Sequence, residues 1–381
     1  MRIAFNTLNE NPQVPSNAVR FIRNLVIALA DRAPENEYVL YVSPDGMTLF
    51  DDVDAPCVSR RVLPYSNERR LRRIVSEQSA VPARLVEDEI DVIHCICGVL
   101  PLRTTVASVL NICTMHHKLF PRQIGLARSA FRSVMFDLSV RNVSRVIANS
   151  NSNRRDILRY LPIAEDRVVL IPEALDTMYL QPADPDESAE TLAELSVQRP
   201  YILFASALFR YKNLETLLDA FALLRRSGAT DHQLVVAGHG HPRYVQQLKG
   251  RAARLGVADD IRFVGHQAAN PLRSLYAEAD VFVYPSLYET FGHPPLQAMG
   301  QGTPVVASDC SSIPEVLGDA ALLFPPRGAE ALHHALRAVI DDGRLRDQLV
   351  ARGHARARHY SWDKTASGVL DAYAAVAPVV R

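Results

Sequence analysis

Short apolar runs alternate with amphipathic stretches along the whole chain. In the first half, strand-like runs are predicted over 2–5, 38–42, 92–94, 109–114 and 146–149, and apolar residues recur at helical spacing over 17–29. Strands interleaved with helices favour a parallel sheet that is covered by helices on both faces. We therefore expect a doubly wound α/β domain that ends near residue 180.

The same alternation restarts after residue 200. Strand-like runs over 201–207, 233–238, 261–265, 281–285 and 304–307 are separated by helical stretches over 213–226, 243–255 and 271–279. The segment between the halves is rich in Pro, Asp and Glu, which is typical of a linker. The pattern predicts Rossmann-like domains over 1–180 and 200–360, joined by a linker over 181–199. A last helical stretch, 362–378, is expected to pack back on the first domain, although it also fits an amphipathic helix of the second.

Composition narrows the functional classes. A chain of 381 residues exceeds what one core usually supports, which agrees with two domains. The formal net charge is zero, so bulk electrostatics do not favour a nucleic-acid partner. No 18-residue apolar segment occurs, and a cytoplasmic protein is expected. The five cysteines are scattered in apolar runs, which predicts buried, reduced thiols.

Residues 281–316 are the most informative stretch. An apolar strand runs into a turn that carries Glu289, Gly292 and His293, and a short helix opens at Pro294 and Pro295. In an open α/β sheet, ligands bind at the carboxyl ends of the strands, where a helix N-terminus presents unpaired N–H groups to an anion. The pattern predicts a phosphate site here.

This stretch resembles the signature of family 4 glycosyltransferases, which are retaining enzymes of the GT-B architecture, with two Rossmann-like domains facing across a cleft. The family has two glutamates eight positions apart; this chain has Glu289 and Gln297, in E-T-F-G-H-P-P-L-Q. The resemblance implies that Glu289 contacts sugar hydroxyls and Gln297 the ribose. Phe291 belongs to the same donor-binding segment, and the backbone amides near Gly292 and His293 are implied to meet the sugar or phosphate.

A second resemblance concerns the donor's diphosphate. The segment ASALFRYKNLETLLDAF is similar to the family's strand-to-helix region, in which an Arg and a Lys hold the diphosphate. Lys212 matches the Lys, Ser206 stands at the Arg position, and Arg210 could reach the same phosphate from the loop. Gly240 and His266 follow two further strands and are expected to line the donor pocket.

The first domain resembles the family less closely. His116 follows an apolar strand and matches a family His that faces the donor sugar, while His117 stands where the family has Asp. The family's Gly-rich turn after the first strand is replaced by a segment without glycine. Asn17 is the nearest candidate for an acceptor-side contact.

No metal or other cofactor is expected. Asp-x-Asp occurs at 52–54 and 184–186, but the first lies in an acidic turn and the second in the expected linker. Lys212, Arg210 and a helix dipole would then neutralise the diphosphate.

Residues 60–84 carry seven arginines against two glutamates. This composition suits an amphipathic helix on anionic lipid, and it equally suits a solvated basic face. Peripheral membrane contact would favour a lipid-linked acceptor.

The resemblance implies a retaining, metal-independent glycosyltransferase of polysaccharide biosynthesis. It would move a hexose from a GDP- or UDP-sugar to a hydroxyl of a glycan or lipid-linked saccharide, with His116, Lys212 and Glu289 at the reacting centre. The alternative is a non-catalytic GT-B module that binds a nucleotide sugar or a protein partner. Ser206, Gln297 and the absent glycine turn favour that alternative.

Overall fold

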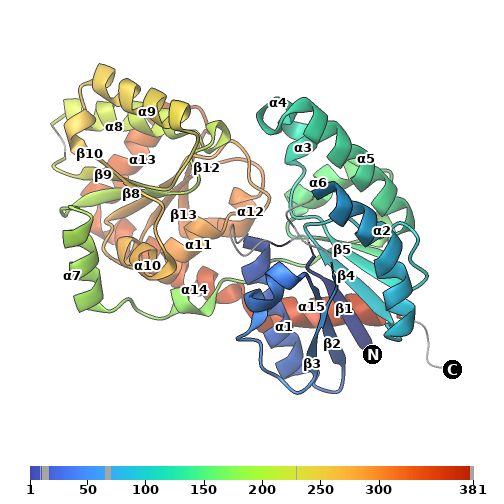
Figure 1. The fold of residues 1–381 in the computed structure, drawn as a ribbon. Helices are drawn as coiled ribbons and strands as arrows, with labels where there is room; N and C mark the ends of the chain where they lie inside the picture. Colours follow the sequence, from blue (N-terminus) through green and yellow to red (C-terminus); the bar gives the residue numbers. More distant parts are fainter. Residues whose placement is uncertain (9, 11–16, 65–69, 229, 378–381) are drawn as a thin grey trace. The chain divides into compact units, whose positions relative to one another are not determined.

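The computed structural model describes residues 1–8, 10, 17–64, 70–228 and 230–377 (Figure 1). The chain divides into an N-terminal unit, Met1–Ala174 with Ser361–Arg381, and a C-terminal unit, Leu175–Tyr360. Among the residues described, none of the helices has the length and apolar character needed to span a bilayer.

The N-terminal unit is built on a seven-stranded sheet in the order β3-β2-β1-β4-β5-β6-β7, with every pairing parallel. Its strands are β1 (Arg2–Asn6), β2 (Glu37–Val42), β3 (Val58–Val62), β4 (Val92–Ile96), β5 (Ala107–Asn111), β6 (Arg145–Ala148) and β7 (Val168–Leu170). The inner strands are buried on both faces, which explains their nearly continuous apolar runs.

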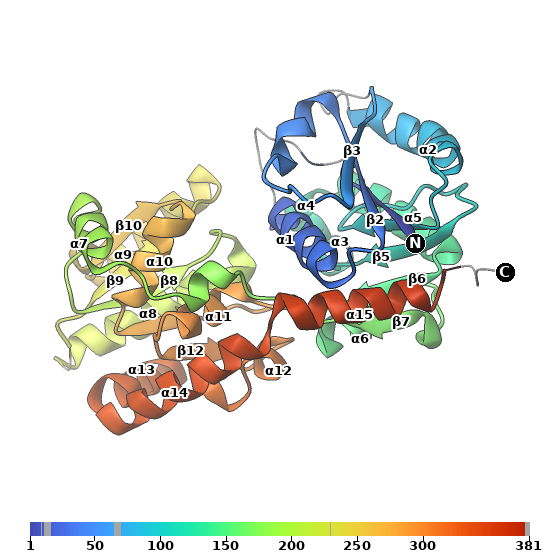
Figure 2. The same cartoon turned by 90° about the horizontal axis from the view of Figure 1, so that it is seen from below.

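Helices cover both faces of this sheet. Its described helices are α1 (Asn17–Arg32), α2 (Arg70–Glu87), α3 (His116–Leu119), α4 (Pro121–Ile124), α5 (Leu126–Asn142), α6 (Asn151–Tyr160) and α15 (Trp362–Ala374). α1 and α15 share one core with the sheet, and α2, α5 and α6 share the other. α15 is the helix expected over 362–378, and it packs against α1 (Figure 2).

The C-terminal unit has a six-stranded parallel sheet in the order β10-β9-β8-β11-β12-β13. The strands are β8 (Tyr201–Ala205), β9 (Gln233–Ala237), β10 (Ile261–Gly265), β11 (Val281–Tyr284), β12 (Val305–Ser308) and β13 (Ala321–Phe324). When the strands are renumbered along the chain with β8 as the first, this is the Rossmann order 3-2-1-4-5-6. The predicted pair of doubly wound Rossmann-like domains is confirmed.

The helices of the C-terminal unit also lie in two layers. They are α7 (Pro185–Glu194), α8 (Leu214–Arg226), α9 (Pro242–Leu255), α10 (Ala269–Ala277), α11 (His293–Gly300), α12 (Ile313–Leu317), α13 (Ala329–Asp341) and α14 (Gly343–His359). α8, α9 and α13 pack on one face of the sheet, and α10, α11 and α12 on the other. Residues 181–199, which the sequence suggested as a linker, include α7 and belong to this unit.

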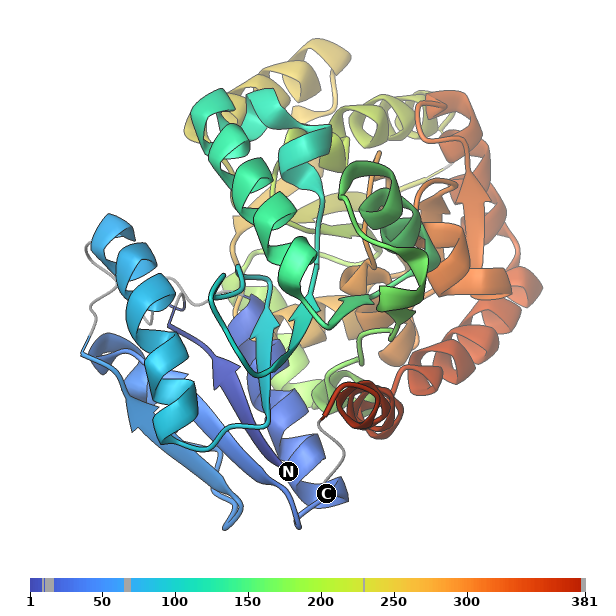
Figure 3. The same ribbon diagram turned by 90° about the vertical axis from the view of Figure 1, so that its right-hand side faces the viewer.

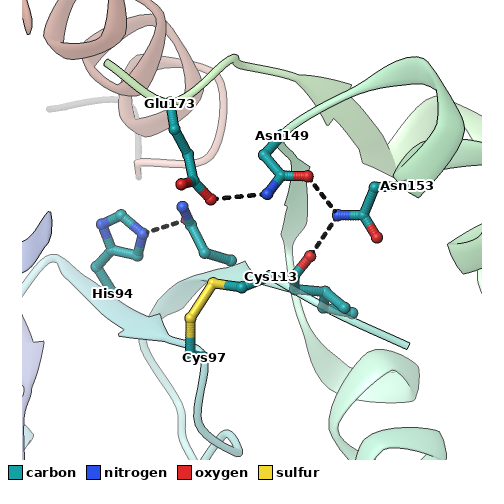
Figure 4. Close-up of a disulfide and its surroundings, with 8 residues drawn as sticks. His94, Cys97, Cys113, Asn149, Asn153 and Glu173 are labelled. Carbon is teal, nitrogen blue, oxygen red and sulfur yellow. Dashed lines mark hydrogen bonds between the residues drawn. A yellow bond between two sulfur atoms is a disulfide. The ribbon is translucent and has the colours of Figure 1, made fainter. Parts of the chain in front are cut away.

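The prediction that all five cysteines are reduced thiols is wrong for one pair. Cys97 and Cys113 form a disulfide across Cα atoms 5.5 Å apart (Figure 4), whereas Cys57, Cys95 and Cys310 are free. The two residues follow β4 and β5, which are neighbours in the sheet. Parallel neighbours end at the same edge, so strand order brings together two cysteines that are 16 positions apart.

Candidate functional site

The strand order of the C-terminal sheet reverses between β8 and β11. From β8 the chain continues toward α8, and from β11 toward α11, so the loops 206–213 and 285–292 leave the same edge in opposite directions. In open α/β sheets, ligands bind in the crevice outside such a switch point. These two loops are therefore the first place to look for a site.

A buried ion pair joins the two loops. Lys212 ends the 3-10 turn η4 (Arg210–Lys212), and its Nζ donates to Glu289 Oε1 at 2.5 Å and to Tyr284 Oη at 2.9 Å. The side chains of Lys212 and Glu289 are only 10% and 11% exposed. The structure thus brings together the two residues that the sequence singled out independently, 77 positions apart.

Tyr284 gives this pair a neutral third member. Burial, followed by the nearby Glu289 carboxylate, raises the pKa of the Tyr284 hydroxyl well above its usual value. The phenol therefore keeps its proton, and the cluster holds one positive and one negative charge. Lys212 can meet an incoming anion while Glu289 remains available to accept hydrogen bonds from hydroxyl groups.

The backbone around Lys212 is fixed by the next residue. Asn213 adopts the left-handed conformation, with φ 58°, and its amide donates to the carbonyls of Pro285 at 3.0 Å and Pro326 at 2.7 Å. The Leu287 N–H donates to the Tyr211 carbonyl at 2.7 Å. The bonds to Pro285 and from Leu287 tie the β8–α8 loop, which carries Lys212, to the β11–α11 loop, which carries Glu289.

Two serines that sequence reasoning missed hold the Glu289 turn. The Glu289 N–H donates to Ser311 Oγ at 2.7 Å, and Ser312 Oγ contacts the carbonyls of Glu289 and Phe291 at 3.0 Å each. Phe291 is 3% exposed, and its ring packs against His293 and Tyr360. Phe291 therefore supports the turn from inside the core.

The helix that follows has a weaker anion site than the sequence suggested. Gly292, at φ 99°, precedes α11, which begins at His293 and continues with Pro294 and Pro295. Prolines at the start of a helix are well tolerated because those N–H groups lack intrahelical partners, but they also have no N–H to offer. Of the first three residues of α11, only His293 has a backbone N–H.

Gln297 and Arg210 already have protein partners. The Tyr276 hydroxyl donates to Gln297 Oε1 at 3.1 Å. This bond occupies one lone pair of the amide oxygen that was expected to contact the ribose. The Arg210 guanidinium donates to Gln247 at 2.7 Å and lies 4.9 Å above the Tyr244 ring. Arg210 is therefore directed toward α9 instead of toward the Lys212–Glu289 pair.

The remaining donor-side candidates follow β8, β9 and β10. A Cβ at Gly240 would lie 2.4 Å from the Leu208 carbonyl oxygen, so only glycine fits between these loops. The His266 ring meets that of His239 edge to face at 5.3 Å. The Ser206 N–H donates to the Ala237 carbonyl, which extends the pairing of β8 with β9.

In the N-terminal unit, His116 and His117 differ in environment. His116 begins α3, its N–H donates to Thr114 Oγ1 at 3.2 Å, and its ring meets Phe120 edge to face. His117 is buried against Phe136, and burial lowers its pKa to about 4. The more accessible His116 keeps the role that the sequence suggested as a prediction.

Asn17 and the two acidic pairs receive little support as site residues. Asn17 is the first residue of α1, but its side chain lies outside the described part of the chain. In the two Asp-x-Asp patterns, Asp52 pairs with Arg23 at 3.1 Å, and Asp184 accepts two backbone hydrogen bonds as the N-cap of α7.

A polar network at the carboxyl edge of the N-terminal sheet was not predicted (Figure 4). Asn149 donates to Glu173 at 2.7 Å and accepts from Asn153 at 2.9 Å, beside the disulfide. Further in, His94 bonds Asn111 Oδ1 at 2.7 Å. The available signal was an asparagine at or directly after the end of two successive apolar strands, β5 and β6.

Comparisons with known proteins agree with the fold and the motifs. The model for glycosyl transferases group 1 matches residues 190–356, and the model for glycosyltransferase family 4 matches residues 18–179. O-antigen chain mannosyltransferase B of Escherichia coli is 34% identical over 239 residues, 62% of this chain and 61% of that protein. D-inositol 3-phosphate glycosyltransferase of Actinosynnema mirum is 30% identical over 250 residues, 64% and 60% of the two chains. These matches span less than two thirds of the relatives' own length.

Solved structures resemble the whole chain. A glycosyltransferase from Rickettsia africae superposes with a TM-score of 0.76 at 16% identity over 98% of both chains. Anabaena HepE, in complex with UDP and glucose, gives 0.75 at 20% identity over 98% of this chain and 99% of its own. At such identities the likeness shows the fold, which is GT-B. Because the two family models also match successive parts that together make up most of the chain, the protein belongs to the family 4 glycosyltransferases.

Proposed function

We propose that this protein is a retaining glycosyltransferase that moves a hexose from a nucleoside-diphosphate sugar to a hydroxyl of a glycan or lipid-linked saccharide. The observation that carries the proposal is the buried Lys212–Glu289 pair at the switch point of the C-terminal sheet. A sugar nucleotide needs a cation for its diphosphate and an acceptor for its sugar hydroxyls, and this pair offers both side by side.

Lys212 would act on the leaving group. The diphosphate gains negative charge as the glycosidic bond breaks, and a fixed ammonium group in a site with little water stabilises that charge more than it stabilises the intact donor. The N–H of His293 would add one hydrogen bond. These groups would neutralise the diphosphate without a metal ion.

Glu289 would orient the sugar. Lys212 bonds Glu289 Oε1 at 2.5 Å and would meet the diphosphate with another N–H, so the carboxylate would accept hydrogen bonds from sugar hydroxyls on its remaining lone pairs. The family resemblance gives His116 a contact with the donor sugar as well, and this stays a proposal. In the family that this chain resembles, the leaving phosphate takes the acceptor's proton, so the reaction needs no second carboxylate.

The relatives' names support the substrate classes. Those of similar sequence include an O-antigen chain mannosyltransferase, a serotype-specific mannosyltransferase and a D-inositol 3-phosphate glycosyltransferase, which favours a hydroxyl on a saccharide or a polyol as the acceptor. HepE in complex with UDP and with UDP-glucose favours a nucleotide-sugar donor. We propose GDP- or UDP-hexose as the donor.

Membrane contact through residues 60–84 is a further part of the proposal. Residues 65–69, and the side chains of 70–73, lie outside what the structure describes. Of the described arginines in this segment, Arg61 pairs with Asp88, Arg60 with Asp51 and Arg84 with Glu87. The composition of the segment therefore remains its only support.

The test has two stages. A thermal-shift screen across nucleoside diphosphates should raise the melting temperature with GDP or UDP, because a ligand that binds only the folded state stabilises it. The matching sugar nucleotides are then incubated with chelator present, and release of the nucleoside diphosphate is followed. Slow release of the nucleoside diphosphate from one donor, accelerated by an acceptor saccharide, would support a catalytic role. Tight binding with no release from any donor would instead support the non-catalytic module.

A further inference from the structure

The charge of α9 is one-sided. Its sequence, PRYVQQLKGRAARL, has four basic residues and no acidic residue, although the whole chain is neutral. On the side that meets α8, the Arg251 guanidinium donates to both carboxylate oxygens of Asp219, at 2.9 and 2.5 Å. Arg243 and Arg254 are exposed, and neither has an acidic partner in the part of the chain that the structure describes. The unbalanced positive charge therefore lies on the outward side of the helix.

That outward side is hollowed into a groove. A cavity of about 380 Å³, a size within the range of ligand pockets, lies along it. Its lining residues are called the α9 groove below and are Arg243, Gln246, Gln247, Gly250 and Arg254. At 100° per residue these positions share one side of α9, opposite the residues that are buried in the core. In Figure 1 and Figure 3, α9 (yellow) lies at the edge of the C-terminal unit, with no described helix or strand of that unit over its outward side.

The α9 groove is long and narrow. Arg243 and Arg254 are about three helical turns apart, so their Cα atoms are separated by about 16 Å along the helix axis. A second cavity, of about 240 Å³, shares Gln247 and Arg254 with the groove and is also lined by Arg210. The groove therefore continues toward the β8–α8 loop, which also carries Lys212.

The floor of the groove is a glycine that the fold does not require. Gly250 lies in the middle of α9, and outside the helix backbone a Cβ there would meet only Arg254 Nη1, at an ordinary 3.6 Å. Glycine is unfavourable inside a helix because its backbone loses more freedom than that of alanine. Gly353 in α14 differs, since its Cβ would approach Met299 Cγ at 3.1 Å, which is a packing reason for glycine. At Gly250 the missing side chain serves only to leave the groove open.

We propose that the α9 groove binds an acidic saccharide chain whose sugars carry carboxylate groups. A guanidinium group at each end matches the carboxylates, and the amides of Gln246 and Gln247 offer hydrogen bonds to the hydroxyl groups between them. A single small anion would occupy only one end of a groove of this length. Nucleic acid fits less well, because none of the lining residues has an aromatic ring on which a base could stack.

This inference rests on the proposed function, because an enzyme that builds a glycan meets saccharide chains as acceptor and product. The α9 groove is separate from the Lys212–Glu289 pair, so a chain bound there would not occupy the donor's place. Holding the growing chain at a second point raises its effective concentration at the transfer site.

The experiment is calorimetric titration of the purified full chain, without donor and at low ionic strength, where screening is weak. Hexagalacturonate is the acidic probe, and maltohexaose is its neutral counterpart. The unaltered protein should bind hexagalacturonate at least about tenfold more tightly, because the carboxylates meet the unpaired guanidinium groups. Arg243→Gln together with Arg254→Gln should weaken this binding at least about fivefold. The matched control is Arg262→Gln with Arg344→Gln, which removes two exposed arginines of the same unit outside the groove and should leave the affinity nearly unchanged.

Gly250 allows a test that does not weaken the fold. Gly250→Ala should raise the melting temperature by about 2–4 °C, because alanine favours the helix. Gly250→Leu fills the floor of the groove and should abolish hexagalacturonate binding, while a thermal melt shows that the protein is folded.

Three results would overturn the proposal. The first is that hexagalacturonate binds no more tightly than maltohexaose, and the second is that the matched control loses as much affinity as the groove variant. The third is that a single-stranded oligonucleotide of the same charge binds more tightly and displaces hexagalacturonate, which would assign the groove to nucleic acid. Release of nucleoside diphosphate from a donor without hexagalacturonate binding would refute the groove alone. Hexagalacturonate binding without release from any donor would refute the proposed reaction alone.

Discussion

The Lys212–Glu289 pair allows a structural role to be separated from donor binding. Lys212→Met removes the ammonium group but keeps most of the side chain's length. Glu289, which is 11% exposed, then holds a buried charge without its partner. Breaking such a pair costs about 3–5 kcal/mol. For a domain of this size each kcal/mol lowers the melting temperature by about 2–4 °C, so the C-terminal domain should melt about 6–20 °C lower.

The double variant Lys212→Met, Glu289→Gln removes both charges. Replacing a whole buried ion pair by neutral groups of similar volume is often close to neutral, so most of the lost stability should return. If Lys212 holds the diphosphate, the affinity for the nucleoside diphosphate stays reduced, by about thirtyfold or more, because the charge-assisted contact costs at least about 2 kcal/mol. Calorimetric titration measures the nucleotide affinity, and thermal melts measure the stability. Both are applied to the unaltered protein, the two single variants and the double variant.

Glu289→Gln completes the cycle. This variant keeps the Lys212 charge, so it should bind the nucleoside diphosphate at least as well as the unaltered protein but transfer the sugar much more slowly. A double variant that regains both stability and nucleotide affinity would refute the assignment, since Lys212 would then serve only to neutralise Glu289. If Lys212→Met leaves the melting temperature unchanged, Lys212 and Glu289 do not form a buried ion pair.

Three further outcomes follow from individual contacts. Burial lowers the pKa of His94 to about 4, whereas the unfolded residue titrates near its ordinary value of about 6.5. As the pH is lowered, the unfolded chain therefore binds the proton first. The free energy of unfolding should fall by about 3 kcal/mol as the pH drops from about 6.5 to about 4. Urea unfolding of a His94→Gln variant should show a shallower pH dependence, and parallel curves would contradict this account. Replacing Cys97 and Cys113 by Ser should lower the unfolding free energy by about 3 kcal/mol, as expected for a loop closed over 16 positions; five free thiols in unreduced, denatured protein would show that the disulfide is not formed. Gly240→Ala should weaken nucleotide binding and lower the melting temperature, because its Cβ would lie 2.4 Å from the Leu208 carbonyl oxygen; normal binding by calorimetry would mean that the loop adjusts freely.

The element pattern was largely predictable because it is local. Strands buried on both faces have continuous apolar runs, and the helices between them repeat at their own period, so both signals lie within a few residues. β3 escaped prediction because it is an edge strand that is mostly exposed, with arginines at its centre. α5 escaped because its outward side is as apolar as its inward side, which hides the helical period.

The site was only partly predictable. Lys212 and Glu289 were found because each lies in a motif, but nothing local indicated that they touch. The direction of Arg210 depends on α9, and the support of the Glu289 turn comes from serines after the next strand. The loss of two amide donors at α11 follows from its prolines alone and could have been foreseen.

The sequence by itself determined the alternation of strands and helices, the two-domain division and the family, since these are written in short periodic patterns and contiguous motifs. The tertiary structure alone decided which strands are neighbours. That order placed Cys97 beside Cys113 and Lys212 beside Glu289. The physical reason is that burial and charge pairing act through space, between residues whose separation along the chain carries no record of their contact.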